Sequence, residues 1–170
     1  DPTLESQAAW QKRLIVGKEP WENEYGVRFS QPHAQALSDV DGDGIKDIIT
    51  GNRYFAHNGH GPNELDPRVL YWFQTKRIKN GKETKVEFVP HLIDGDTGVG
   101  TQLVAGDIDG DGLVDVVVGN KYGCRVLLQR REEVNAGRYA QFQPKKIYGP
   151  DRVQPKDYKT GQKAGDAVKG

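Results

Sequence analysis

A nine-residue aspartate-rich segment occurs twice in this chain and limits the folds that it can adopt. The two copies are DVDGDGIKD, residues 39–47, and DIDGDGLVD, residues 107–115. In both copies, carboxylates occupy positions 1, 3, 5 and 9, and glycines occupy positions 4 and 6. Four negative charges in one tight turn repel each other unless a cation lies among them. Each segment is therefore predicted to be a cation-binding turn.

The two segments belong to a longer internal repeat whose offset, 107 minus 39, is 68 residues. The same offset aligns Gly51 with Gly119 and Tyr54 with Tyr122. A short apolar stretch precedes each acidic segment (AQAL and QLVA), and a β-branched stretch follows it (DIIT and DVVVG). Such stretches on either side of a turn are typical of a β-hairpin. Each copy is thus predicted to fold as strand, acidic loop, strand.

Further predicted strands extend each hairpin to a larger unit. RVLYWFQ and GCRVLLQ follow the two hairpins, and three stretches share an aromatic residue followed by an isoleucine: WQKRLIV, FVPHLID and FQPKKIY. Four short strands per unit, with no helical period, are typical of a propeller blade. The predicted fold class is all-β, with β-propeller-type blades of four antiparallel strands, about two blades plus part of a third. Because two blades cannot close a ring, we expect a partial or oligomer-completed propeller.

The composition agrees with a turn-rich β fold. Apolar residues make up 35% of the 170 residues, and the chain holds 21 glycines and 9 prolines, which favours short strands over a helical bundle. Lys plus Arg and Asp plus Glu both number 24, so neither a nucleic acid nor an anionic membrane surface is an expected partner. No apolar run reaches the roughly 18–20 residues that span a bilayer.

The repeats and the C-terminal end differ in character. Residues 1–150 are predicted to hold the β-blade repeats, whereas residues 151–170 are polar, rich in Gly and Lys, and predicted to be a tail or linker. The chain begins at Asp1 without a Met, so it is expected to be a mature or excised segment. Its single cysteine, Cys124, lies in an alternating stretch and is expected to be a buried structural thiol.

The acidic segments are predicted to hold one Ca²⁺ each. Hard oxygen ligands that alternate along a loop suit Ca²⁺, which takes about 6–8 oxygens in irregular geometry, and the loop glycines allow a sharp turn around the ion. The predicted ligands of the first site are the carboxylates of Asp39, Asp41, Asp43 and Asp47 and the carbonyl of Ile45. The predicted ligands of the second site are the carboxylates of Asp107, Asp109, Asp111 and Asp115 and the carbonyl of Leu113.

An EF-hand is the closest alternative for these loops, and the sequence disagrees with it at two points. The twelfth position of an EF-hand is a bidentate Glu, but here it is Thr50 in one copy and Val118 in the other. An EF-hand loop also leads into a helix, whereas DIIT and DVVVG favour strands. A solvated acidic turn without a metal is the remaining alternative.

The acidic loops with their flanking strands read SDVDGDGIKDIITGN and GDIDGDGLVDVVVGN. Both resemble FG-GAP (VCBS-type) repeats, the calcium-bearing blades of extracellular β-propellers, and the resemblance covers about residues 10–130. The phrases PHAQALSDVDGDGIKDIITGNRYFAH and VEFVPHLIDGDTGVGTQLVAGDIDGDGLVDVVVGNKYG are similar to blades of large secreted proteins of planctomycete-type bacteria. They are also similar to the propeller of aldos-2-ulose dehydratase, a sugar lyase. The phrase FG-GAP itself is absent, so the resemblance depends on the loops and their strands.

A second group of candidate residues lies in GNRYFAHNGHG, residues 51–61, directly after the first hairpin. Loops at such positions often carry binding residues. The candidates are Arg53, Tyr54, His57 and His60. The cationic and imidazole groups suit a sugar or a carboxylate, and His57 or Tyr54 suits a general acid or base. Alternatively, Arg53 and its counterpart Lys121 pair with loop carboxylates, and the aromatic residues pack between blades.

Three functions are compatible with these features. The first is an extracellular calcium-binding propeller-type module for binding or scaffolding, secreted or periplasmic, with a carbohydrate or another protein chain as partner. The second, implied by the similarity to the dehydratase, is a carbohydrate (keto-sugar) lyase or dehydratase, or the propeller part of one. The third is a self-assembling surface or matrix protein whose open blades pair between chains. A non-enzymatic role is favoured because no complete catalytic motif is present.

Overall fold

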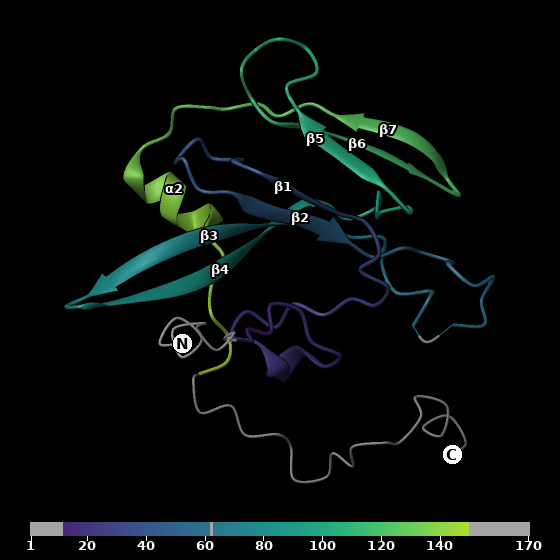
Figure 1. The fold of residues 1–170 in the computed structure, drawn as a ribbon, viewed down its shortest axis with the longest axis horizontal. Coiled ribbons are helices and arrows are strands. Elements are labelled where there is room, and N and C mark those ends of the chain that lie inside the picture. The colour runs from purple at the N-terminus through teal and green to yellow at the C-terminus, as the bar shows by residue number, and fades with distance from the viewer. Residues whose placement is uncertain (1–11, 62, 150–170) are drawn as a thin grey trace, which may run out of the picture.

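The chain forms two antiparallel β-sheets, seen in a computed structural model that describes residues 12–61 and 63–149 (Figure 1). The first sheet contains, in order, β1 (Gln35–Ser38), β2 (Asp47–Gly51), β3 (Leu70–Asn80) and β4 (Glu83–Asp94). The second sheet contains β5 (Leu103–Gly106), β6 (Asp115–Asn120) and β7 (Gly123–Leu127). Two short helices, η1 (Pro20–Glu22) and α2 (Ala136–Phe142), lie outside the sheets. The predicted all-β fold class is confirmed.

Each acidic segment joins the first two strands of its sheet, as predicted. The register pairs Ser38 with Asp47 in the first hairpin and Gly106 with Asp115 in the second. The loop glycines at positions 4 and 6 have φ angles between 79° and 84°, a region that glycine enters without steric cost. The glycine pattern therefore shapes both loops alike.

The boundary between the two units differs from the sequence prediction. FVPHLID shares its aromatic–isoleucine pattern with the stretch before the first hairpin, which places it at the start of the second unit, but it forms the second half of β4 and pairs with β3 in the first sheet. The polar stretch KRIKNGKETK continues both strands around a two-residue loop, Gly81 and Lys82, because Asn80 pairs with Glu83. Gly81 has a φ of 61°, which suits a central position of a tight hairpin turn. The first sheet thus has the four expected strands, and the second has three within the described residues.

The third aromatic–isoleucine stretch, FQPKKIY, contributes no strand. Phe142 ends α2, whose first turn is capped by the side chain of Asn135. The backbone N–H groups of Ile147 and Tyr148 donate to the carbonyl of Glu24 at 2.9 and 3.1 Å. This stretch therefore runs back to Glu24, near the start of the described residues. The predicted tail at 151–170 lies outside the described residues.

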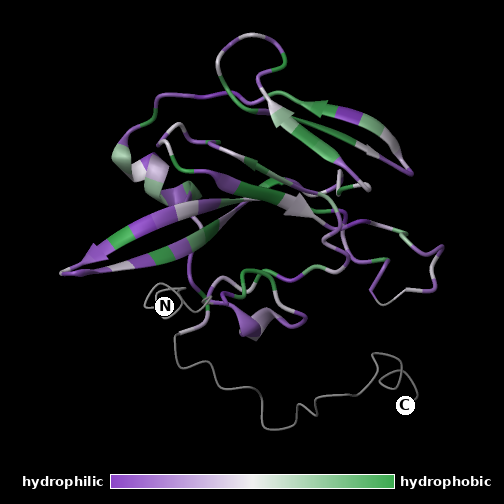
Figure 2. Ribbon diagram, in the orientation of Figure 1, coloured by the Kyte–Doolittle hydropathy of each residue, from purple (hydrophilic) through white to green (hydrophobic). Residues whose placement is uncertain are grey.

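Two apolar clusters hold the sheets in place, one on each face of the first sheet. Ile49 and Trp72 face the second sheet, whereas Ile48 and Phe73 face the opposite way, because side chains alternate along a strand. We call residues 12–34 the N-terminal segment; it covers that opposite face (Figure 1). Figure 2 shows the apolar residues concentrated on the strands. Within the described chain, neither helix has the length and apolar character needed to cross a bilayer.

Candidate functional site

Each acidic loop brings three carboxylates within reach of a single ion. The first group is Asp39, Asp41 and Asp43, and the second is Asp107, Asp109 and Asp115. Within each group, one carboxylate oxygen from each residue lies within 4.8 Å of one oxygen from each of the others. Because Ca²⁺ sits about 2.3–2.6 Å from its oxygen ligands, one ion can contact all three carboxylates of a group. The donor set is oxygen alone, which fits a hard cation.

The first aspartate of each loop is fixed by the loop backbone. The two oxygens of Asp39 accept hydrogen bonds from the N–H groups of Gly42 and Gly44, both at 2.9 Å. Asp107 makes the equivalent pair of bonds at 2.7 and 3.0 Å. Since a carboxylate oxygen can accept more than one hydrogen bond, these bonds leave room for a metal. The loops are thus held in shape around their carboxylates.

The ninth aspartate of the first loop, Asp47, has a structural role that the sequence did not reveal. Its side chain is buried at the start of β2, with 1% of its surface exposed. One oxygen accepts from the N–H of Val40 at 3.1 Å, and the other accepts from the N–H of Thr75 at 2.8 Å. Asp47 therefore ties the acidic loop to β3.

Asp115 makes the same connection in the second sheet. Its buried carboxylate accepts from the N–H groups of Ile108 and Gln129, both at 2.8 Å. These bonds lower the pKa of Asp115, with help from the charge of Arg130. Burial instead raises the pKa of Asp47, against the effect of its own backbone bonds. The pKa values of the two equivalent aspartates are therefore shifted in opposite directions.

A short segment links the two acidic loops; we call residues 129–131 the strap. Gln129 accepts from the N–H of Val114 at 3.0 Å and donates through Nε2 to the carbonyl of Val40 at 3.2 Å. Arg131 donates to the same carbonyl at 3.1 Å. The first loop and the second loop therefore lie next to each other, joined by side chains of the strap.

The remaining predicted ligands are distributed unevenly. Asp111 lies outside the second carboxylate group, and its oxygen pairs with Arg130 at 3.1 Å. Asp47 lies outside the first group. The N–H groups of Ile45 and Leu113 donate to loop aspartates two residues earlier. Metal binding by the carbonyls of Ile45 and Leu113, like that by the carboxylates, stays a prediction.

The structure separates the four candidate catalytic residues. Arg53 and Tyr54 line a groove of about 470 Å³ at the end of the second sheet opposite its acidic loop, together with Lys121. The side chains of His57 and His60 are exposed and do not line this groove. The four residues therefore do not form one catalytic cluster.

The loop that carries the two histidines is organised by a glutamate that sequence reasoning missed. The side chain of Glu64 is buried, and its carboxylate accepts hydrogen bonds from the N–H groups of His57 and Gly59. The sequence signal is slight, because Glu64 is one carboxylate among 24. Glu64 supplies this loop with a polar centre in place of an apolar core.

The contacts around the groove agree in part with the alternative prediction, in which Arg53 and Lys121 pair with loop carboxylates and the aromatic residues pack between blades. The rings of Tyr54 and Tyr122 lie between the two units, with centroids 5.4 Å apart. Lys121 donates to the carbonyl of Phe55 at 2.8 Å and to Asn58 at 2.7 Å, so it does not pair with the loop carboxylates. The aromatic residues thus pack between the units as expected, and the predicted pairing of Lys121 with carboxylates is wrong.

The cysteine prediction is also wrong. Cys124 is exposed, because its register with Gly119 places it on the face of the second sheet that points away from the first.

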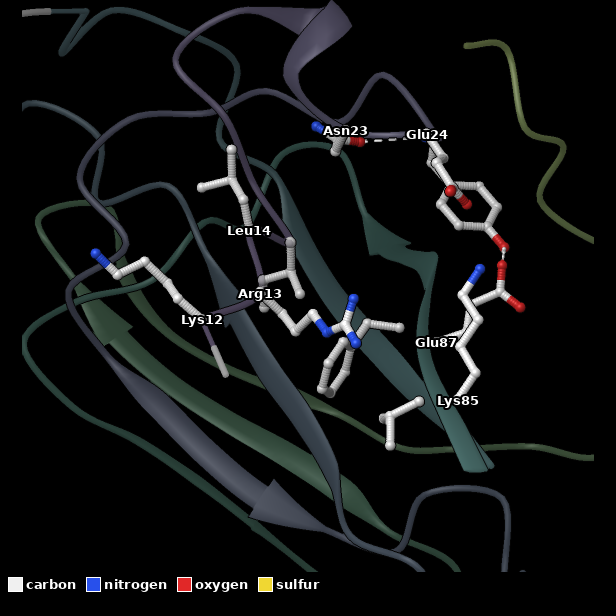
Figure 3. A pocket seen from close by; sticks show the side chains of 11 residues that line it. Lys12, Arg13, Leu14, Asn23, Glu24, Lys85 and Glu87 are labelled. Atoms are coloured by element: carbon white, nitrogen blue, oxygen red, sulfur yellow. Dashed lines mark hydrogen bonds between the residues drawn. The ribbon is translucent and has the colours of Figure 1, made fainter. Parts of the chain in front are cut away.

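A further cavity of about 250 Å³ lies between the N-terminal segment and β4 (Figure 3). At its edge the Tyr25 hydroxyl donates to Glu87 at 2.9 Å, and Lys146 pairs with Glu24 at 2.7 Å and with Glu87. Burial raises the pKa of Tyr25 to about 12, and its bond to Glu87 adds to the effect. These contacts fasten the N-terminal segment and the end of the described chain to the sheet, and we assign them a structural role.

Comparison with known proteins gives one match. Residues 99–125 match the FG-GAP repeat family. The matched part runs from the approach to β5, through the second acidic loop and β6, to the middle of β7. No curated protein and no solved structure matches the chain.

Proposed function

We propose that this chain is a calcium-stabilised β-propeller-type repeat module that acts outside the cytosol, in binding or scaffolding. The observation that carries the proposal is the pair of acidic loops, each with three carboxylates whose oxygens lie within 4.8 Å of one another. The FG-GAP repeat over residues 99–125 supports a propeller-type module. The ions would be structural, because they neutralise the loop carboxylates and strengthen hairpins whose first strands have four residues.

The residues of each loop would hold the ion through oxygen atoms alone. A bound Ca²⁺ supplies positive charge, and the chain supplies a prearranged loop in which Asp39 or Asp107 is already fixed by backbone N–H groups. Extracellular modules bind Ca²⁺ with dissociation constants of about 10⁻⁴–10⁻³ M. Sites of this strength would fill outside a cell and stay largely empty in the cytosol, so the proposal includes a secreted or periplasmic location.

A carbohydrate lyase or dehydratase is the less favoured alternative. It would need Arg53 or Tyr54 to act with His57 or His60, and only the first two line a common groove. A carbohydrate or protein partner that binds without reaction is compatible with the same groove.

Calcium is expected to raise the melting temperature of the full chain by several degrees relative to EDTA. At a concentration about tenfold to thirtyfold above the dissociation constant, each site contributes about 1–2 kcal/mol to the free energy of unfolding. Differential scanning calorimetry in EDTA, in Mg²⁺ and in Ca²⁺ measures the effect.

The matched control is the double variant Asp41→Asn and Asp109→Asn, which removes the half-buried carboxylate of Asp41 and the exposed carboxylate of Asp109 without touching the buried Asp47 and Asp115. Its melting temperature is expected to respond little to Ca²⁺. Identical melts of the parent chain in EDTA and in Ca²⁺, with the metal content verified, would contradict the proposal.

A further inference from the structure

The outward face of the second sheet is apolar and uncovered among the described residues. Val104, Val117 and Val126 lie side by side across β5, β6 and β7. The exposed fractions of Val104 and Val126 are 58% and 53%, and Val117 between them is half-buried. Figure 2 shows the apolar colouring along β5 and parts of β7. Contiguous exposed apolar surface of this kind is typical of a contact surface.

The internal repeat shows which surface of the first sheet this face corresponds to. The correspondences are Val104 to Ala36, Val117 to Ile49, and, by strand register, Val126 to Trp72. In the first sheet these three residues pack against the second sheet. The three valines thus occupy positions equivalent to those that already form a sheet-to-sheet interface once in this chain.

We propose that this valine face (Val104, Val117 and Val126) packs against the same face of a second copy, in a two-fold symmetric dimer. In a head-to-tail arrangement, the valine face of one copy would pack against the opposite face of the first sheet in the next copy, the face that carries Ile48 and Phe73. That face is covered by the N-terminal segment, where Val27 and Phe29 pack on Phe73.

The valine face therefore meets its own equivalent, and such an isologous contact closes at two copies. Gly106 and Gly119 lie on the same face and leave open space beside the valines. Two sheets can approach closely there.

Sedimentation equilibrium on the full chain tests the dimer. A small apolar interface is expected to give a dissociation constant in the range of about 10–500 µM, and the double variant Val104→Lys and Val126→Lys is expected to weaken it at least about tenfold because two charges lose their hydration. The control is Leu65→Lys, an exposed apolar residue on the loop after β2 (66% exposed), which should dimerise like the parent. Circular dichroism melts establish that both variants are folded.

A second measurement needs no substitution. Cys124 lies on the same face as Val126 and is the only cysteine of the chain, so its rate of thiol modification should fall as the protein concentration rises. A parent chain that stays monomeric to about 500 µM, a lysine variant that dimerises equally well, or growth into open polymers would overturn the proposal. If the parent chain stays monomeric, the valine face does not bind a second copy, and a different partner would have to cover it.

A second, independent observation distinguishes the two acidic loops. The guanidinium of Arg130 pairs with Asp109 at 3.0 Å and with Asp111 at 3.1 Å. In the first loop the side chain that binds a ligand carboxylate is a neutral amide, Gln74, which donates to Asp41. The guanidinium of Arg131 also lies beside the first loop, but it donates to the Val40 carbonyl and pairs with no carboxylate among the described contacts. The two loops thus have the same carboxylate spacing and different carboxylate partners.

We infer that the second loop binds Ca²⁺ more weakly than the first, an inference that rests on the proposed calcium function. An incoming ion must displace Arg130 or share carboxylates with it, and the two cations repel each other. The Arg130 side chain is 60% exposed, so water screens part of this repulsion. We therefore expect a difference of about three- to tenfold in dissociation constant between the loops.

A calcium titration, monitored by the NMR chemical shifts of the Gly44 and Gly112 amides, measures the binding midpoint of each loop separately. Arg130→Gln should strengthen binding at Gly112 about three- to tenfold and leave Gly44 unchanged. Lys121→Gln is the control, because Lys121 donates to the Phe55 carbonyl and to Asn58, at the end of the second sheet opposite its acidic loop; it should shift either midpoint less than about twofold. Equal midpoints in the parent chain would overturn the inference, whereas no response of either amide would refute the calcium function itself.

Discussion

Replacing Asp115 with asparagine is expected to lower the melting temperature by about 10 °C, even without metal. The buried carboxylate accepts two backbone hydrogen bonds, from Ile108 in the loop and from Gln129 in the strap, both at 2.8 Å. An asparagine amide keeps one acceptor oxygen and turns its NH₂ group toward the other N–H. The substitution therefore leaves a buried donor unpaired and loosens the loop from the segment that follows β7.

Calorimetry in EDTA measures this change, with Asp109→Asn as the matched control. Asp109 belongs to the same carboxylate group but is exposed. Its replacement relieves repulsion within the group and removes an exposed ion pair with Arg130, so it should alter the melt by no more than a few degrees. The pH dependence gives a second readout. Because the pKa of Asp115 is lowered in the folded chain, its contribution to stability is present above the unfolded value of about 3.9 and is lost as the pH falls below it. Equal melts for the two variants would contradict the structural role of Asp115.

Replacing Phe73 with alanine is expected to reduce the free energy of unfolding by about 3–5 kcal/mol. Phe73 has no exposed surface and is the largest fully buried side chain of the described chain. It lies on the face of the first sheet that the N-terminal segment covers, in one cluster with Val27 and Phe29, and its ring centroid is 5.9 Å from that of Tyr71. The truncation leaves a cavity at the place where the N-terminal segment is held.

Urea unfolding followed by tryptophan fluorescence measures the loss, and the slope of the transition shows whether the folded state remains compact. Leu65→Ala is the control, because Leu65 is 66% exposed and its replacement should cost less than about 0.5 kcal/mol. A loss below about 1 kcal/mol for Phe73→Ala would mean that the N-terminal segment does not depend on this cluster.

Local features of the fold were predictable because their causes lie within a few residues. The loop glycines adopt positive φ angles, and the flanking β-branched residues favour strands. Both hairpins therefore follow from short stretches of sequence. The spacing of Asp39, Asp41 and Asp43 places three carboxylates on one turn for the same reason.

Other features depend on contacts between distant residues, which no local pattern records. The partner strand of FVPHLID is set by pairing along all of β3, so this stretch joins the first sheet and not the second. Asp47 bonds to a backbone group 28 residues away. The buried carboxylate of Glu64 and the strap of residues 129–131 become meaningful only when the chain has folded.

The sequence by itself determined the paired acidic hairpins, their glycines and the all-β character, because turn geometry and strand preference act over short distances. Only the tertiary structure decided what surrounds each loop. It placed Arg130 against the second loop and the neutral Gln74 against the first, and it separated His57 and His60 from the groove of Arg53 and Tyr54. It also left the valine face uncovered among the described residues. These outcomes depend on which apolar faces pack together, and burial of those faces involves residues that are far apart in the chain.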